Sequence, residues 1–371
     1  MSEADLPALT RQLLWLAFGL GLAFGAIAQR SHFCAMGAVA DVFNMGDWSR
    51  MRMWALAIGV AMIGFNAMVG AGWIDASKSV YAGPRFIWLS ALVGGLMFGF
   101  GMVLASGCGS KTLVRLGGGN LKSLVVFIVL GVAAFATLKG VTAVARVASV
   151  DTVFIPLPSG QDLPSLAAAA TGLPKGTLAV VLGLGLGGAL VAWALARPEG
   201  RSADALLAGL GIGALVVGLW WVSGRLGHVA EDPNTLQEAF VATNSQRMEG
   251  FTFVAPMAYT LDWLMLFSDK SKVLTLGIVT TVGVVVGSAL YSVATRSLRW
   301  EGFRDAQDTA DHIVGAVLMG MGGVTALGCT IGQGLTGLST LSLTSFVAFG
   351  AIIAGAVLGL RFQIWRIERA A

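Results

Sequence analysis

The residues best suited to chemistry in this sequence are its three cysteines, Cys34, Cys108 and Cys329. Each lies in a short, glycine-containing segment between long apolar stretches. An odd number of thiols cannot pair completely within one chain, so a structural disulfide framework is not expected. The chain has no C-x-x-C motif, and its three histidines lack the spacing of metal ligands, so we predict neither a metal site nor a cofactor.

The sequence around these thiols is typical of an anion receptor. A helix that begins in such a segment presents free N–H groups and the positive end of its dipole to a ligand. Glycine lets the backbone approach that ligand closely, and a thiol adds a weak donor on a polarisable sulfur. We therefore predict that the substrate contacts Cys34, Cys108, Cys329, Gly107, Gly109, Gly328 and Thr330. The competing interpretation is that each cysteine is only a small apolar residue at a tight helix contact.

The composition indicates that these segments lie in a membrane protein. Of 371 residues, 56% are hydrophobic and only 12% are charged, whereas soluble domains carry roughly 25% charged residues. The mean hydropathy is +0.78. The small net charge of +4 comes from basic residues scattered between apolar runs, which indicates membrane topology and no nucleic-acid partner. We predict an all-α polytopic membrane protein with lipid around it.

The apolar windows predict about nine transmembrane helices, at 13–29, 51–72, 86–105, 121–147, 175–196, 204–223, 273–295, 312–328 and 341–361. Between these helices lie four segments that are too short to cross the membrane or hard to assign. We expect them to be re-entrant loops or half helices. These segments are 32–45, 106–118, 251–268 and 329–338.

Basic residues predict the orientation of the chain. The connections that follow odd-numbered crossings are the shorter ones and carry 14 of the 24 basic residues. Because short, basic connections stay in the cytoplasm, we expect a periplasmic N-terminus and a cytoplasmic C-terminus. The basic residues concerned are Arg30, Arg50, Arg52, Lys111, Arg115, Lys122, Arg197, Arg201, Arg296, Arg299, Arg304, Arg361, Arg366 and Arg369.

The chain also repeats itself. A shift of 221 residues aligns 99–108 with 320–329, and six of these ten positions are identical, including Cys108 and Cys329. The shift moves five crossings, an odd number, so the second copy is expected to be inverted in the membrane, with a site between the copies. We predict a first inverted repeat over 1–147, a connecting loop and linking helix over 148–203, and a second repeat over 204–371.

These motifs resemble those of the YeeE/YedE family of sulfur transporters. The resemblance rests on Arg30-Ser-His-Phe-Cys34 followed by Asp41, on Gly107-Cys108 with Gly117-Gly-Gly-Asn120, and on the run from Gly328 to Gly337. It implies a non-enzymatic inner-membrane protein with two inverted halves, which takes up thiosulfate or a related sulfur anion. The three cysteines would then relay the substrate through S–H contacts without covalent bonds. It also implies cooperation with a separate, TusA-like cytoplasmic sulfurtransferase (TsuB).

The motifs leave several functions open. Some relatives of this type are linked to selenium, and other sulfur oxyanions fit the same pattern. A membrane sulfurtransferase that carries a cysteine persulfide is a different class of function, and a non-transporting docking subunit is another. Lys111 and Arg115 either attract the anion or only set the topology, and Asp41 and Asp262, at equivalent repeat positions, are predicted to cap half-helices.

Overall fold

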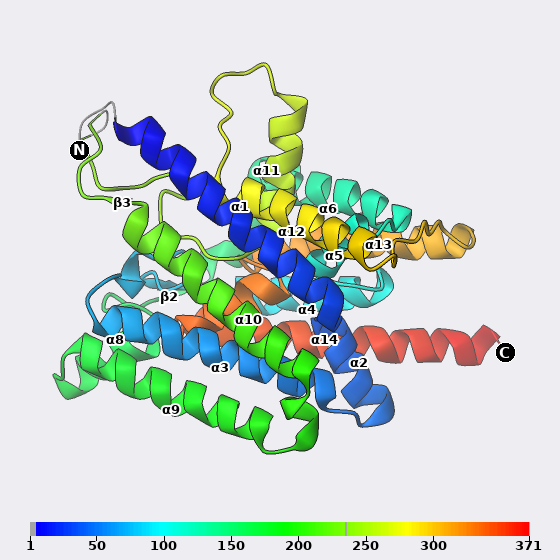
Figure 1. Cartoon of the computed structure of the whole chain (residues 1–371), viewed down its shortest axis with the longest axis horizontal. Coiled ribbons are helices and arrows are strands. Elements are labelled where there is room, and N and C mark those ends of the chain that lie inside the picture. Colours follow the sequence, from blue (N-terminus) through cyan, green and yellow to red (C-terminus); the bar gives the residue numbers. More distant parts are fainter. Residues whose placement is uncertain (1–4, 234–235, 371) are drawn as a thin grey trace.

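The computed structural model describes residues 5–233 and 236–370, and within these ranges the regular structure is mostly helix, with four two-residue strands (Figure 1). Eight segments of the described chain are long and apolar enough to cross a membrane. They are Asp5–Met45, Ser49–Gly70, Trp88–Gly117, Leu121–Lys139, Lys175–Leu195, Ala203–Leu226, Leu276–Ala294 and Leu343–Arg369. The predicted all-α polytopic fold is confirmed.

Long helices account for all the predicted crossings. They are α1 (Asp5–Ser31), α3 (Ser49–Gly70), α4 (Trp88–Leu104), α6 (Leu121–Lys139), α9 (Lys175–Leu195), α10 (Ala203–Trp221), α12 (Leu276–Ala294), α13 (Ala306–Thr325) and α14 (Leu343–Ala370). The predicted crossing 312–328 lies on α13, which is not among the eight apolar segments and begins with Asp308 and Asp311. Predicted crossing 121–147 is broken at Gly140, between α6 and α7 (Val141–Ala148).

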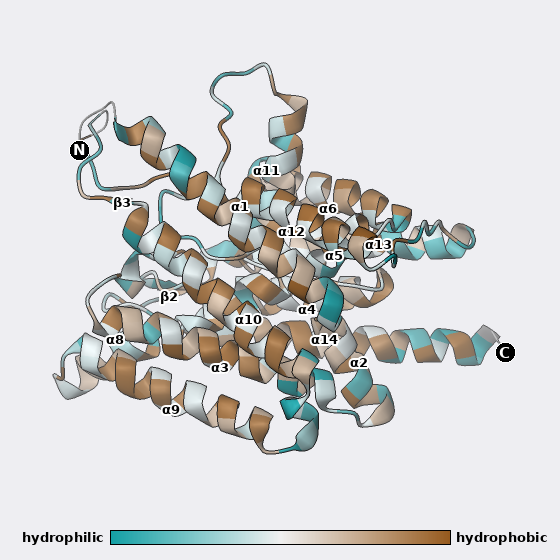
Figure 2. Cartoon of the chain, viewed as in Figure 1, coloured by the Kyte–Doolittle hydropathy of each residue, from teal (hydrophilic) through white to brown (hydrophobic). Residues whose placement is uncertain are grey.

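The four short segments form short helices, as expected from their length. These are α2 (Ala35–Met45), α5 (Gly109–Gly117), α11 (Val254–Met265), and a helix that begins at Thr330 and includes the π-helical stretch Gly332–Gly337. Colouring by hydropathy shows apolar residues along the long helices, with hydrophilic residues gathered toward their ends and the connections (Figure 2). The first residues of α1 and the last residues of α14 lie at opposite ends of the molecule (Figure 1).

Close helix contacts depend on glycine. Helix α1 packs against α12 and α10, α3 against α9 and α10, α4 against α13 and α14, and α6 against α13. A Cβ added at Gly25 of α1 would lie 2.1 Å from the carbonyl oxygen of Val284, and one at Gly287 would lie 2.0 Å from that of Leu22. These two glycines therefore set how closely α1 and α12 approach, as small residues do in membrane helix pairs.

The long connections fold over the end of the bundle where α1 begins (Figure 1). Strand β1 (Arg85–Phe86) pairs with β2 (Ile155–Pro156), and β3 (His228–Val229) pairs with β4 (Ala239–Phe240), both antiparallel. α8 (Leu163–Thr171) follows this first pair, and the amide of Gln161 donates to the carbonyl of Tyr81 at 2.8 Å. The segments 148–174 and 224–250, to which the sequence assigns no role, thus form the contacts that connect the helices at this end of the bundle.

Ion pairs fix the far ends of two short helices. Asp41 on α2 pairs with Arg50 at 2.7 Å, and Asp262 on α11 pairs with Lys272 at 2.6 Å. The favoured prediction, that these aspartates cap helix N-termini, was wrong, because both lie more than one turn after the first residue of their helices. Each carboxylate instead joins its short helix to the segment that follows.

We expect Asp262→Asn to lower the midpoint of thermal unfolding in detergent, because it leaves Lys272 without its charged partner. Hydrogen bonds to charged groups contribute about 1.5–3 kcal/mol, and the Asp262 side chain is only 9% exposed. Asp269→Asn is the matched control, since Asp269 lies on the same connection and is exposed. Equal unfolding midpoints for the two variants would contradict this role.

Candidate functional site

The same backbone turn precedes each of the three cysteines. The residue two positions before each thiol has a positive φ, 51° at His32, 54° at Ser106 and 57° at Leu327. Left-handed backbone of this kind ends a helix and reverses the chain, and it is uncommon outside glycine. The next N–H closes the turn by bonding back to the helix, in Phe33 to Ala28 (3.2 Å), Gly107 to Met102 (2.8 Å) and Gly328 to Gly323 (2.7 Å).

Each cysteine then occupies the N-cap position of a short helix. Cys34 caps α2 and its sulfur accepts the N–H of Gly37 at 3.3 Å. Cys329 immediately precedes the helix that begins at Thr330, and its sulfur accepts the N–H of Gly332 at 3.4 Å. Cys108 caps α5, with its sulfur 3.3 Å from the hydroxyl of Ser110. Sulfur is a weak acceptor, so these N-termini keep much of their capacity to bind an anion.

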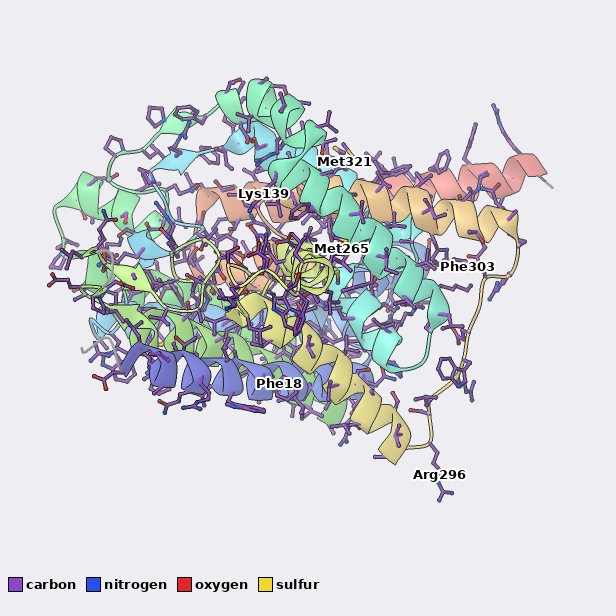
Figure 3. The ribbon with its side chains drawn as sticks, turned by 90° about the horizontal axis from the view of Figure 1, so that it is seen from above. Phe18, Lys139, Met265, Arg296, Phe303 and Met321 are labelled. Atoms are coloured by element: carbon purple, nitrogen blue, oxygen red, sulfur yellow. The ribbon has the colours of Figure 1, made fainter. Side chains whose placement is uncertain are left out.

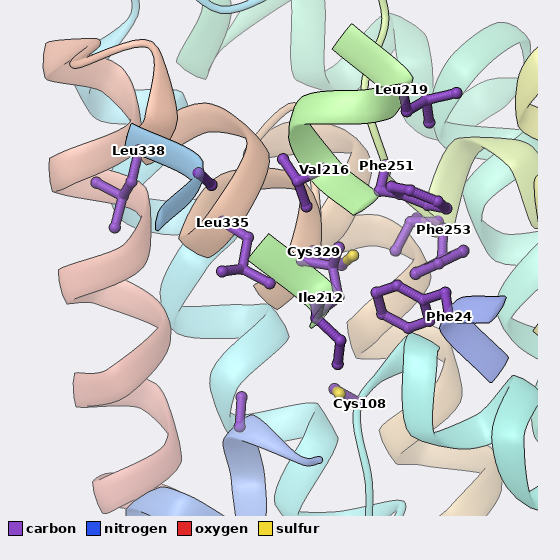
Figure 4. Close-up of a cluster of buried hydrophobic side chains, with 14 of the residues drawn as sticks. Phe24, Cys108, Ile212, Val216, Leu219, Phe251, Phe253, Cys329, Leu335 and Leu338 are labelled. Atoms are coloured by element: carbon purple, nitrogen blue, oxygen red, sulfur yellow. The ribbon is translucent and has the colours of Figure 1, made fainter. Parts of the chain in front are cut away.

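The three thiols converge inside the protein. The side chains of Cys34 and Cys108 interact directly, and Cys108 also lies beside Thr330. Cys329 is close enough to Cys108 for an electrostatic interaction between the two thiols. Figure 4 places Cys108 and Cys329 in one packed cluster with Phe24 and Phe253. The exposed fraction is 2% for Cys34 and 0% for the other two, so the site is closed in this state.

A fourth helix N-terminus completes the site without a thiol. Helix α11 begins beside Cys329, whose sulfur faces the backbone N–H of Phe253. The position of α11 that corresponds to Cys34 in the repeat is Ala255. Sequence reasoning missed this helix as part of the site, although its Gly250 and Pro256 were signals of a re-entrant segment.

A cavity of about 180 Å³ lies next to the thiol site, on the side of Cys329. Its lining includes Tyr81, Glu249, Thr252 and Tyr259, and it reaches Gly328, the neighbour of Cys329. We call this cavity the vestibule. Burial raises the pKa of the Glu249 carboxyl and of the Tyr81 hydroxyl above their ordinary values. The Glu249 carboxylate also accepts the backbone N–H groups of Asn244 and Ser245, at 3.1 and 2.8 Å, which partly offsets the effect of burial.

A second hollow adjoins the vestibule and carries basic residues. It also measures about 180 Å³, and the two share Asn244 and Tyr259 in their linings. Lys139 at the end of α6 and Lys272 line this outer hollow. Figure 3 shows Lys139 near Met265, the last residue of α11, on the face seen from above. Asp262 lines the same hollow and pairs with Lys272 at 2.6 Å, so part of this positive charge is neutralised.

The other predicted site residues have distinct environments. A Cβ at Gly107 would lie 3.2 Å from the side chain of Lys111, and one at Gly328 would lie 3.3 Å from that of Gln333. Gly109 has more room, with its nearest contact 3.7 Å away at Met257. The hydroxyl of Thr330 is buried and makes no hydrogen bond within the described chain.

The two basic residues after Cys108 differ in position. Lys111 lies close enough to interact electrostatically with Cys34. Arg115 turns back and donates to the carbonyl of Ser106 at 3.1 Å, so it stabilises the turn before Cys108.

Comparison with known proteins identifies relatives along almost the whole chain. A sequence profile for sulphur transport matches residues 30–358. The thiosulfate transporter TsuA of Escherichia coli is 27% identical over 90% of each chain. TsuA of Spirochaeta thermophila is 23% identical over 92% of this chain and 97% of its own. A probable transporter, YedE of Escherichia coli, is 33% identical over 30% of this chain and 26% of its own.

We expect the three thiols to resist N-ethylmaleimide in the folded protein and to react fully after denaturation, because none is more than 2% exposed. Mass spectrometry of intact protein would count the adducts. A single cysteine introduced at the exposed position Ser271 provides the control for reagent activity. Rapid labelling of the native thiols in the folded, substrate-free protein would contradict a closed site.

Proposed function

The chain belongs to the sulphur transport family, and we propose that this membrane transporter takes up thiosulfate, or a closely related sulfur-containing anion, through the constriction formed by its thiols. The observation that carries the proposal is the convergence of three buried cysteines, each at a helix N-terminus, beside a vestibule that reaches Gly328. The substrate named for the two relatives that match along about 90% of this chain supports the same choice.

The proposed path uses weak contacts in sequence. The anion enters past Lys139 and Lys272, passes the vestibule and meets Cys329, then Cys108, then Cys34. At each step a thiol S–H donates to the terminal sulfur of the anion, while helix N–H groups face its negative charge. We include in this path the other predicted substrate contacts, at Gly107, Gly109, Gly328 and Thr330. No covalent bond forms, so the substrate leaves unchanged.

We propose that two inverted repeats frame the path, 1–147 and 204–371, joined by 148–203. The shift of 221 residues places α2 over α11, α3 over α12, α4 over α13 and α6 over α14. The packing of α4 on α14 corresponds to that of α13 on α6. Asp41 and Asp262 stand at matching positions, and each pairs with a basic residue downstream, Arg50 and Lys272, whose positions differ by one residue under this shift.

The proposed setting is the bacterial inner membrane, with the N-terminus in the periplasm and the C-terminus in the cytoplasm. The vestibule then opens to the periplasm, and Cys34 is the last thiol before the cytoplasm. A separate TusA-like sulfurtransferase (TsuB) in the cytoplasm would accept the substrate and give uptake its direction. Lack of any effect of such a protein on uptake would remove this partner from the proposal.

Two alternatives make different predictions. Transport of selenium compounds or other sulfur oxyanions would appear as rescue of growth on those compounds and not on thiosulfate. In a membrane sulfurtransferase, a cysteine thiolate would attack the outer sulfur of thiosulfate. The S–S bond of thiosulfate would break, sulfite would leave, and the cysteine would keep the outer sulfur as a persulfide. That product adds about 32 Da, the mass of one sulfur atom, to a cysteine, and intact-mass spectrometry after thiosulfate exposure would detect it.

We expect Cys34→Ser, Cys108→Ser and Cys329→Ser each to lower thiosulfate uptake about tenfold or more, which corresponds to the loss of one hydrogen bond to a charged group. Serine keeps the size and the N-cap, so the folded protein should persist. The measurement is uptake of labelled thiosulfate into cells that lack other thiosulfate transporters.

Ser31→Ala is the matched control, because Ser31 ends α1 and its hydroxyl bonds only locally, to the Ile27 carbonyl. Uptake at the wild-type rate in all three cysteine variants would refute the relay.

A further inference from the structure

A small void lies next to the thiol site. It measures about 10 Å³ and is lined by Thr330, Trp54 and Ala35, together with the apolar residues Ala38, Val39, Met51, Met102, Phe349, Ile352 and Ile353. Thr330 follows Cys329 and lies beside Cys108, and Ala35 follows Cys34. The void therefore adjoins the end of the proposed path.

Two of the residues that line this void carry buried hydrogen-bond donors, and the polar neighbour of the Thr330 hydroxyl is the weakly accepting sulfur of Cys108. The indole Nε1 of Trp54 and the hydroxyl of Thr330 make no hydrogen bond within the described residues. Trp54 is 2% exposed and Thr330 is 0% exposed. Leaving a buried donor unpaired costs free energy, about 1–3 kcal/mol for each group, so two such donors beside one void need an explanation.

The ring of Trp54 is held independently of its N–H group. It stacks on Phe33 with centroids 4.6 Å apart and planes at 11°, and on Phe349 at 6.3 Å and 19°. Trp220 offers a comparison, because it is equally buried but its Nε1 donates to the hydroxyl of Ser339 at 3.0 Å. The fold thus satisfies one buried indole and leaves the other unpaired beside the path.

We propose that Trp54 and Thr330 form a second subsite, next to the thiols, which binds the oxygen atoms of a tetrahedral sulfur oxyanion. The inference rests on the proposed function. It assigns Trp54 and Thr330 to the oxygen atoms of the substrate, whereas the thiols contact its terminal sulfur. A void of this size holds at most about one water molecule, so the anion enters only when the lining moves. Met51 and Met102 are suited to this, since methionine side chains adapt their shape readily.

The test compares variants that remove only the donor. Trp54→Phe keeps an aromatic ring in the stack but lacks the N–H group, and Thr330→Val keeps the shape but lacks the hydroxyl. We expect each to weaken thiosulfate binding to the purified protein about tenfold, as for a hydrogen bond to a charged group, and Thr330→Ser to bind as wild type. Isothermal titration calorimetry with sodium thiosulfate measures the Kd, and the KM of uptake should rise in parallel.

Trp220→Phe is the control for loss of a buried indole. Both Trp220→Phe and Trp54→Phe should lower the thermal unfolding midpoint, because each shrinks a buried ring. Only Trp54→Phe should change the Kd. Wild-type Kd in both Trp54→Phe and Thr330→Val would overturn the subsite while leaving thiosulfate uptake intact. Absence of thiosulfate uptake by the wild-type protein would instead overturn the proposed function.

Discussion

The structure depends on how helix N-termini are satisfied within a membrane. The first N–H groups of a helix have no partner inside the helix, and lipid offers none. Here three of the four short helices begin deep in the protein with a cysteine at the N-cap, and two of these sulfurs accept an N–H of the first turn at 3.3–3.4 Å. Because sulfur accepts weakly, the helices are stable enough to form but still attract a better acceptor. The turns, the burial of the thiols and the vestibule all serve this arrangement.

Much of this arrangement could be predicted from the sequence, because the signals were local. Long apolar runs marked the membrane helices, and glycine next to Cys108 and Cys329 marked two of the short ones. The order of contacts among the thiols could not be predicted, since it depends on segments up to 295 residues apart, from Cys34 to Cys329. The capping role assigned to Asp41 was wrong for a similar reason, because its partner Arg50 comes from the next helix.

The environment of Trp54 is a second feature that could not be predicted from the sequence. In the sequence it is one of 11 tryptophans, a residue type that commonly anchors helices at the membrane interface. Trp15 and Trp300 fit that description, with 69% and 75% of their surface exposed, but Trp54 is 2% exposed. Its unusual state comes from three elements that meet around it, the turn before Cys34, α3 and α14. No pattern within any one of these elements indicates an unpaired donor.

Helix dipoles can supply much of the positive charge that a binding site for a dianion needs. Each helix N-terminus is equivalent to about half a positive charge, so four that converge supply about two, close to the charge of thiosulfate. These dipoles are fixed in the backbone and surrounded by low-dielectric protein, where they act more strongly than in water. A lysine cluster at the constriction would bind the anion more tightly and slow its release, whereas conduction requires binding that is weak enough to reverse. Lys139 and Lys272 line the outer hollow, and at the thiols Lys111 lies close enough to Cys34 to add positive charge there.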